Sequence, residues 1–163
     1  MKESENNKSP WLSKTIVSLF GIGYFPGFPG TIASLVVASA AFALASFIDI
    51  NWLWDVEVFL FLLLLGLIPG TQLVKNQGIK DPSWFVMDEA AGMWLSMLFI
   101  PKDNIWLVIV AFATFRVFDI WKPWLIREAE KIPGATGIML DDVLAAVPSW
   151  AITFIIWKTF IQM

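Results

Sequence analysis

Apolar residues in this chain are gathered into long runs, and short polar segments separate them. The runs are Ile32–Ile48, Val58–Val74, Ala90–Ile100, Ile105–Ile120 and Val143–Ile161. Apolar stretches of nearly 20 residues are typical of helices that pack against one another within lipid. The pattern therefore predicts an all-α fold, an integral membrane bundle of about five hydrophobic helices.

The third run is too short for a full span. Ala90–Ile100 would extend about 16 Å as a helix, whereas the hydrocarbon layer is ~30 Å thick. Either this run is a partial span, or its helix begins near Trp84 and carries Asp88 and Glu89 inside.

Three segments are expected to interrupt helices. Residues Asp49 to Glu57 read as an acidic loop, and Pro69 is expected to kink or end the second helix. The segment Lys122–Leu140 contains Pro133-Gly134 and is expected to form a tight, flexible loop.

Composition supports a membrane setting. The chain has 163 residues, of which 58% are hydrophobic and only 15% charged, and its mean hydropathy is +0.70, whereas a soluble domain carries about 25% charged residues. We expect residues 1–14 to form a cytoplasmic tail and residues 15–163 a single membrane-embedded domain.

The net charge of −3 argues against nucleic acid as a partner. The absence of His and Cys excludes imidazole and thiolate chemistry.

Basic residues predict the orientation, because cytoplasmic loops are enriched in Lys and Arg. A cytoplasmic N-terminus places most cations on that side: Lys2, Lys8, Lys14, Lys75, Lys80, Lys122, Arg127 and Lys131. Only Lys102 and Lys158 would lie opposite. The same topology brings the polar groups of the chain to the cytoplasmic face.

Five carboxylates interrupt or adjoin the apolar runs. They are Asp88, Glu89, Asp119, Asp141 and Asp142. An ionised side chain at membrane depth costs roughly 2.5 kcal/mol or more unless it is paired or binds a cation, so a divalent metal is the simplest common partner. The alternative is that each acidic pair only caps a helix, with Asp141 as the N-cap of the last one.

Two further groups suit a phosphate. Arg116, Asp119 and Lys122 share one broad helix face, where they could bind an anion or form an intrahelical ion pair with a snorkelling Lys. The glycine-rich turn that ends at Gly30 and Thr31 could present backbone N–H groups to an anion, or could be a simple turn. Together with the carboxylates, these groups predict a Mg²⁺ and phosphate site, since Mg²⁺ prefers hard oxygen ligands.

Four ordered motifs carry a family resemblance. They are PGFPGTIASL at 26–35, DPSWFVMDEAAGMW at 81–94, FRVFDIWKPW at 115–124 and GATGIMLDDVLAA at 134–146. Through them the chain resembles the bacterial phosphatidylglycerophosphatase A family over nearly its whole length. It departs from the family pattern at Ala33, Leu125 and Ala146, none of which removes a charged group.

The resemblance implies a Mg²⁺-dependent, multi-pass enzyme of the bacterial inner membrane, with its active site facing the cytoplasm. Such an enzyme removes the terminal phosphate of phosphatidylglycerophosphate, a phospholipid substrate, to give phosphatidylglycerol in phospholipid biosynthesis. The five carboxylates match family motif positions as catalytic and metal-binding residues, Arg116 and Lys122 as phosphate-binding residues. Asp81 and Thr31 also fall on motif positions.

The reaction path has open alternatives. Water activated by Mg²⁺ is the expected nucleophile, but a carboxylate could instead attack phosphorus and form an aspartyl-phosphate. From another functional class, a small ion-coupled carrier would use the same carboxylates as cation sites. Carrier ligands usually lie near the membrane midplane, whereas these acids lie near the ends of the runs.

Overall fold

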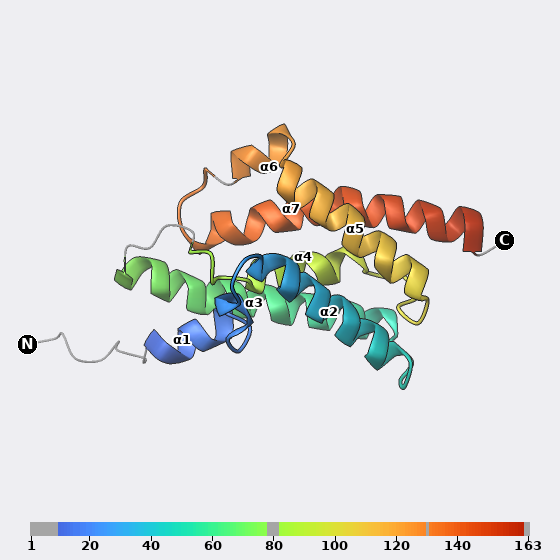
Figure 1. Cartoon of the computed structure of the whole chain (residues 1–163), viewed down its shortest axis with the longest axis horizontal. Helices are drawn as coiled ribbons and strands as arrows, with labels where there is room; N and C mark the ends of the chain where they lie inside the picture. The colour runs from blue at the N-terminus through green and yellow to red at the C-terminus, as the bar shows by residue number, and fades with distance from the viewer. Residues whose placement is uncertain (1–9, 78–81, 130, 162–163) are drawn as a thin grey trace, which may run out of the picture.

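The computed structural model of the chain describes residues 10–77, 82–129 and 131–161. All regular secondary structure in these ranges is helical (Figure 1). The elements are α1 (Pro10–Val17), η1 (Ile22–Tyr24), α2 (Pro29–Ala45), α3 (Trp52–Gln77), α4 (Met87–Ser96), α5 (Ile105–Trp121), α6 (Trp124–Ala129), α7 (Ala135–Ile156) and η2 (Trp157–Ile161). The all-α prediction is confirmed, although the described part of the chain contains more helices than expected.

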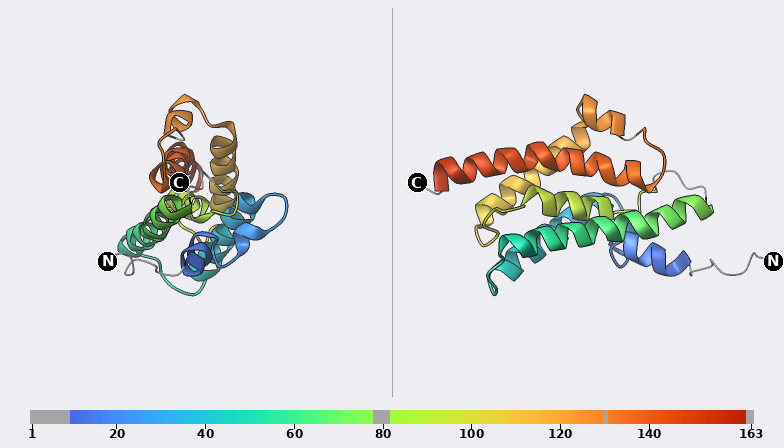
Figure 2. Two further views of the ribbon diagram at one scale, coloured as in Figure 1. Left: turned by 90° about the vertical axis from the view of Figure 1, so that its left-hand side faces the viewer. Right: turned by 180° about the vertical axis from the view of Figure 1, so that it is seen from behind.

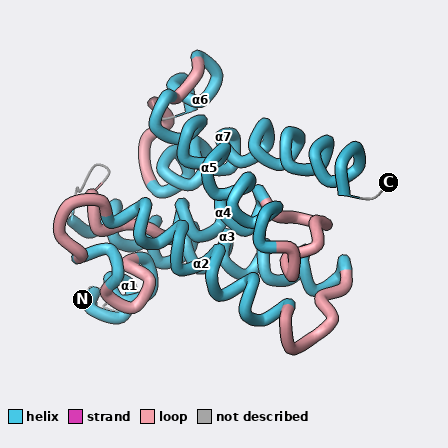
Figure 3. The backbone as a smooth tube through the Cα atoms, turned by 45° about the vertical axis from the view of Figure 1, so that its right-hand side comes forward, coloured by secondary structure: helices cyan, strands magenta, loops and turns pink. Residues whose placement is uncertain are grey.

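The short helix α4 forms the centre of an elongated bundle (Figure 2). Eight of its ten residues are buried. Helix α7 packs most extensively against α4 and α5, and α2 and α3 also pack against α4. Most connecting loops lie at the two ends of the bundle (Figure 3). Side chains at the start of α4 are therefore surrounded by other helices, although α4 itself is too short to cross the bundle.

Local signals fix several helix ends. Pro29 occupies the start of α2, where its missing N–H has no intrahelical partner to lose. The side chain of Asn104 accepts hydrogen bonds from the backbone N–H groups of Trp106 and Leu107, which caps α5. At the other end of α5, Lys122 adopts a left-handed conformation with φ 44°. Pro123 follows, and this ends the helix beside the polar site.

Small residues let the central helices approach closely. A Cβ atom at Gly66 would lie 2.2 Å from the sulfur of Met139, and one at Gly92 would lie 2.7 Å from the ring of Phe115. Such contacts need a glycine, so α3 meets α7 and α4 meets α5 at short range.

Large apolar side chains are exposed along the outside of the bundle. On α3 they include Leu60, Phe61, Leu64 and Ile68. Two helical segments, Trp52–Val74 and Ala135–Ile161, are long and apolar enough to cross a membrane. Contiguous exposed apolar surface of this kind marks a lipid or protein contact, which suggests membrane association.

Some predicted boundaries are wrong and others hold. The acidic loop expected for residues Asp49 to Glu57 ends early, because α3 begins at Trp52. Helix α3 continues past Pro69 to Gln77, so Pro69 does not end it, while the kink expected there as the alternative stays a prediction. An apolar helix within a bundle can accommodate an internal proline, because neighbouring groups satisfy the freed backbone. The third apolar run lies mainly in α4, which begins before Ala90 and carries the acidic pair in its first turn.

The loop predicted for Lys122–Leu140 is also wrong. It contains α6 and the first turns of α7, which starts after Gly134. Asp141 and Asp142 therefore lie within α7 rather than at its N-cap. The apolar pattern missed this start because Thr136 and Gly137 break it, and Asp141 and Asp142 separate it from the apolar run that follows.

The N-terminal tail is described only in part. Helix α1 begins at Pro10, inside the tail predicted for residues 1–14, while residues 1–9 lie outside the described part of the chain. In Figure 1, α1, the end of α3, α6 and the start of α7 lie at the same end of the bundle. Lys14, Arg127 and Lys131 belong to segments at this end; the side of the membrane that it faces stays a prediction.

Candidate metal and phosphate site

Three carboxylates from two helices meet inside the bundle. Asp88 and Glu89 lie in the first turn of α4, and Asp142 lies in the second turn of α7. One carboxylate oxygen from each falls within 4.8 Å of the others. Asp88 and Asp142 are buried, and Glu89 is half-buried. Residues more than 50 positions apart in the sequence thus form one acidic cluster, which could hold a metal ion.

Two glycines allow this approach. A Cβ atom at Gly92 would lie 3.1 Å from the backbone oxygen of Asp142, and one at Gly30 would lie 1.9 Å from Oε1 of Glu89. Helix α7 therefore abuts α4 one turn after the acidic pair, and the start of α2 presses on the Glu89 carboxylate. Gly30 has a packing role that the sequence did not reveal; its predicted contact with phosphate stays a prediction.

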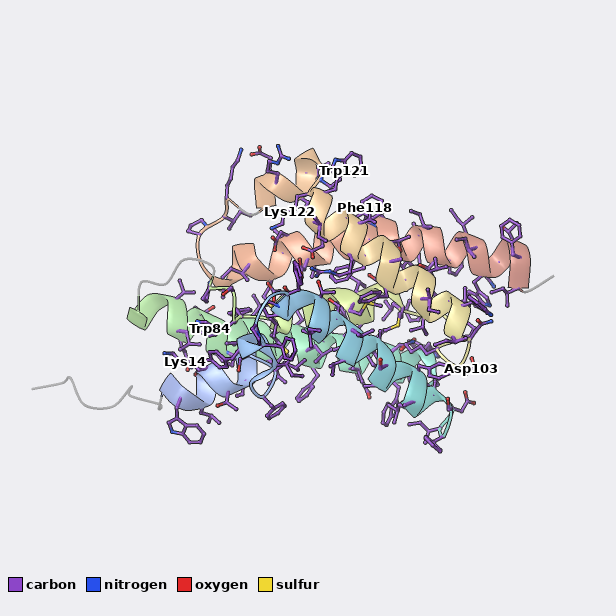
Figure 4. All side chains as sticks on the ribbon, viewed as in Figure 1. Lys14, Trp84, Asp103, Phe118, Trp121 and Lys122 are labelled. Atoms are coloured by element: carbon purple, nitrogen blue, oxygen red, sulfur yellow. The ribbon has the colours of Figure 1, made fainter. Side chains whose placement is uncertain are left out.

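Two cations flank the acidic cluster, each paired with one of the remaining carboxylates. Arg116 lies 2.5 Å from Asp119, and Nζ of Lys122 lies 2.8 Å from Oδ2 of Asp141. The other oxygen of Asp141 accepts a hydrogen bond from the backbone N–H of Asp142. Figure 4 shows Lys122 above the first turns of α7. The five predicted carboxylates thus divide into three that form the cluster and two that hold cations.

Several polar atoms of the site are buried without a hydrogen-bond partner. They are Oδ1 of Asp88, Oε2 of Glu89, Oδ2 of Asp142 and Nε of Arg116. Leaving a buried polar atom unsatisfied costs about 1–3 kcal/mol, and more when the group is charged. A cation among the carboxylates and an anion beside the guanidinium would satisfy them, so the donor set fits both a metal and a phosphate.

Burial and like charge also act on the acidic pair of α4. Burial, and after it the neighbouring carboxylate of Glu89, raises the pKa of Asp88 well above its ordinary value. Burial likewise raises the pKa of Glu89. Negative charges crowded in this way repel one another unless a cation neutralises them.

A pocket of about 300 Å³ opens onto the cluster. Nine of the predicted site residues line it: Gly30, Thr31, Asp88, Glu89, Arg116, Asp119, Lys122, Asp141 and Asp142. Asp81 lies outside the described residues. The pocket is also lined by Ser83 and by Phe28, which the sequence analysis did not select. The position of Ser83 between Asp81 and the acidic pair was the available signal.

Similarity to a known family covers most of the chain. The model of the family described as phosphatidylglycerophosphatase A matches residues 15–157. The chain belongs to this family. The predicted resemblance is thereby confirmed over nearly the whole chain.

Curated relatives of this chain carry two different names. A phosphatidylglycerophosphatase A from Escherichia coli is 34% identical over 142 residues, covering 84% of this chain and 78% of the relative. Its namesake from Haemophilus influenzae is 35% identical over 142 residues, covering 84% and 83%. A putative phosphatidylinositol-3-phosphatase from Bacteroides thetaiotaomicron is 39% identical over 136 residues, covering 80% and 84%. No solved structure matches the chain.

Proposed function

We propose that this chain removes the terminal phosphate of phosphatidylglycerophosphate, giving phosphatidylglycerol and inorganic phosphate. The family and the two phosphatidylglycerophosphatase A relatives support this reaction. The observation that carries it is the single pocket in which three incompletely satisfied carboxylates lie beside two cationic side chains. One end of this pocket suits a metal, and the other suits the phosphate that the metal would contact.

Mg²⁺ is the proposed metal, held by Asp88, Glu89 and Asp142. Carboxylate oxygens are its preferred protein ligands, and the described part of the site offers no nitrogen or sulfur ligand that would favour another metal. When bound, Mg²⁺ supplies charge neutralisation at the phosphoryl oxygens and lowers the pKa of a water molecule. Asp119 and Asp141 stay in the proposed set of catalytic and metal-binding residues, because substrate phosphate that binds Arg116 and Lys122 replaces the two carboxylates as partners of these cations.

The cationic residues of the pocket bind and orient the phosphate. Arg116 has a planar fork that matches phosphate oxygens, and its Nε has no hydrogen-bond partner in the described structure. Lys122 is held over the pocket by Asp141 and by the end of α5. Thr31 and Ser83 add hydroxyl groups at the rim. Water is the proposed nucleophile. Direct attack by a carboxylate is the alternative, and it predicts that rapid quenching with phosphate-labelled substrate traps labelled protein.

A second substrate is favoured by one relative. The putative phosphatidylinositol-3-phosphatase is more identical to this chain than either phosphatidylglycerophosphatase A named above. Phosphatidylinositol 3-phosphate is likewise a phosphomonoester on the polyol head group of a membrane lipid. The same metal and cations could therefore act on it, and both lipids belong in the test.

We propose a multi-pass protein of the bacterial inner membrane whose pocket faces the cytoplasm. The two long apolar helical segments and the exposed apolar surface support insertion in the bilayer. The Lys and Arg residues of the segments beside the pocket support the orientation. Neither the family nor the relatives support the ion-coupled carrier.

The test is phosphate release by detergent-purified protein from each of the two lipids, with and without Mg²⁺. We expect turnover only with Mg²⁺, and loss of turnover in Asp88→Asn. Asp49→Asn is the matched control, since Asp49 is an exposed acid at the other end of the bundle. Turnover in EDTA, or full activity of Asp88→Asn, would contradict the proposal.

A further inference from the structure

A second surface lies against the loop that leads into the acidic pair. The backbone N–H of Val86 donates a hydrogen bond to the carbonyl oxygen of Val17, at 2.9 Å. A Cβ atom at Gly23 would lie 2.0 Å from the backbone oxygen of Trp84. Helix α1 and the turn η1 are therefore packed directly on the segment that enters α4, although neither lines the acidic pocket.

A cation lies over one of two stacked aromatic rings in this surface. Nζ of Lys14 lies 5.7 Å from the centre of the Trp84 ring, and the ring of Tyr24 stacks on Trp84 with centres 6.0 Å apart (Figure 4). Lys14 is half-buried, and among the described residues no carboxylate forms an ion pair with it. The positive charge thus lies over the Trp84 ring, and no carboxylate of the described residues pairs with it.

The segment that contains Tyr24 carries several exposed aromatic side chains. Tyr24, Phe25 and Phe28 are each more than half exposed, at 57%, 53% and 77%. Phe20 is 80% exposed and adopts a left-handed backbone with φ 55°, a costly conformation for a bulky residue. Aromatic rings with a basic residue are typical of surfaces that contact lipid head groups. Phe28 also lines the acidic pocket, so the two surfaces are continuous.

We propose that Lys14, Tyr24, Phe25, Phe28 and Trp84 form a binding site for an anionic phospholipid of the surrounding leaflet, beside the phosphate pocket and continuous with it through Phe28. The lipid phosphate contacts Lys14, and the aromatic rings contact the glycerol and the upper acyl chains. The site holds the mouth of the pocket at head-group depth and raises the local concentration of anionic lipid. Its role in catalysis rests on the proposed lipid phosphatase activity, but lipid binding itself does not.

The first test measures binding without turnover. Purified protein in detergent is titrated with phosphatidylglycerol or with phosphatidylcholine, and bound lipids are counted by native mass spectrometry. A Lys near a membrane surface contributes about fivefold to anionic lipid binding, so we expect Lys14→Gln to bind phosphatidylglycerol about fivefold more weakly and Lys14→Arg to bind it normally. Phosphatidylcholine binding should not change.

Lys158→Gln is the matched control. Lys158 also lies over aromatic rings, 4.3 Å from that of Trp157 and 5.6 Å from that of Phe154, but at the C-terminal end of the bundle. Equal phosphatidylglycerol binding by the wild type, Lys14→Gln and Lys158→Gln would overturn the proposal. An equal loss in both variants would also overturn it, because the effect would then be one of total charge.

The second test measures turnover in nanodiscs with increasing anionic lipid. Lys14→Gln should raise KM several-fold with kcat unchanged, and this difference should vanish at high salt, which screens surface charge. A fall in kcat alone would instead indicate that Lys14 only supports the fold of the loop. If the wild type hydrolyses neither lipid, the proposed function fails, while the binding test still decides the lipid site.

Discussion

The bundle buries carboxylates at two ends, and their surroundings differ. At the end away from the acidic pocket, Asp55 and Lys102 form an ion pair 2.6 Å long, with side chains only 3% and 2% exposed. The second oxygen of Asp55 accepts a hydrogen bond from the backbone N–H of Phe99, and Nζ of Lys102 lies over the ring of Trp94. At the other end, three carboxylates face one another.

The difference separates a structural use of buried charge from a functional one. The Asp55–Lys102 pair is neutral as a whole, and its residues join α3 to the loop after α4. Burial lowers the pKa of Lys102, while Asp55 acts in the opposite direction. The cluster of Asp88, Glu89 and Asp142 contains no cation of its own, so a bound cation is needed to neutralise it.

The largest effect is expected from removing one charge of the acidic cluster. Asp142→Asn should lower kcat more than about 100-fold, since even groups one step removed from a metal change affinity or activity by 10–100-fold. Its thermal unfolding should be unchanged or slightly improved, because one repelling charge is gone. Phosphate release and circular dichroism on the same sample measure both. Near-normal kcat would exclude Asp142 from the metal site.

The opposite outcome, a loss of stability with normal activity, is expected at the Asp55–Lys102 pair. Lys102→Met leaves Asp55 buried without its cation, which should lower the free energy of unfolding by about 3 kcal/mol. The kcat of the folded protein should stay within about twofold of wild type, because the Asp55–Lys102 pair lies at the other end of the bundle from the acidic pocket. Denaturant unfolding in detergent measures the loss. In the double variant Asp55→Asn with Lys102→Met, part of the stability should return; a further additive loss would show that the pair is not the source.

A smaller effect is expected where the start of α2 contacts the acidic cluster. Gly30→Ala places a Cβ atom against Glu89 and should weaken Mg²⁺ affinity about tenfold by displacing that carboxylate. Ser39→Ala, on the exposed side of the same helix, is the control. Mg²⁺ titration by calorimetry compares the two. Equal affinities would mean that Glu89 can move away without loss of the site.

The smallest effect concerns pH. Because the pKa values of Asp88 and Glu89 are raised in the folded state, metal-free protein should lose stability as the pH rises from the ordinary carboxylate range through the raised values. Mg²⁺ binds the ionised groups, so its stabilising effect should grow over the same interval. We expect the Mg²⁺-induced rise in Tm to be about 3 °C larger at pH 8 than at pH 5.5, a difference near 1 kcal/mol. A shift independent of pH would contradict this coupling.

The sequence predicted the members of the site better than the elements that carry them. Charges within apolar runs are costly, so Asp88, Arg116 and Asp142 could be recognised without a fold. The start of α7 could not, because Thr136 and Gly137 break the apolar pattern there, and Asp141 and Asp142 separate it from the apolar run that follows. The packing role of Gly30 could not be predicted either, since it depends on Glu89, nearly 60 positions away.

Asp141 and Asp142 are neighbours in the sequence but serve different partners. Successive residues of an α-helix point about 100° apart, so Asp141 meets Lys122 while Asp142 meets the acidic pair of α4. A single-residue deletion between Gly134 and Asp141 would rotate both side chains by that angle, and neither would reach its partner. The spacing from the start of α7 to its acids is therefore constrained by two contacts at once.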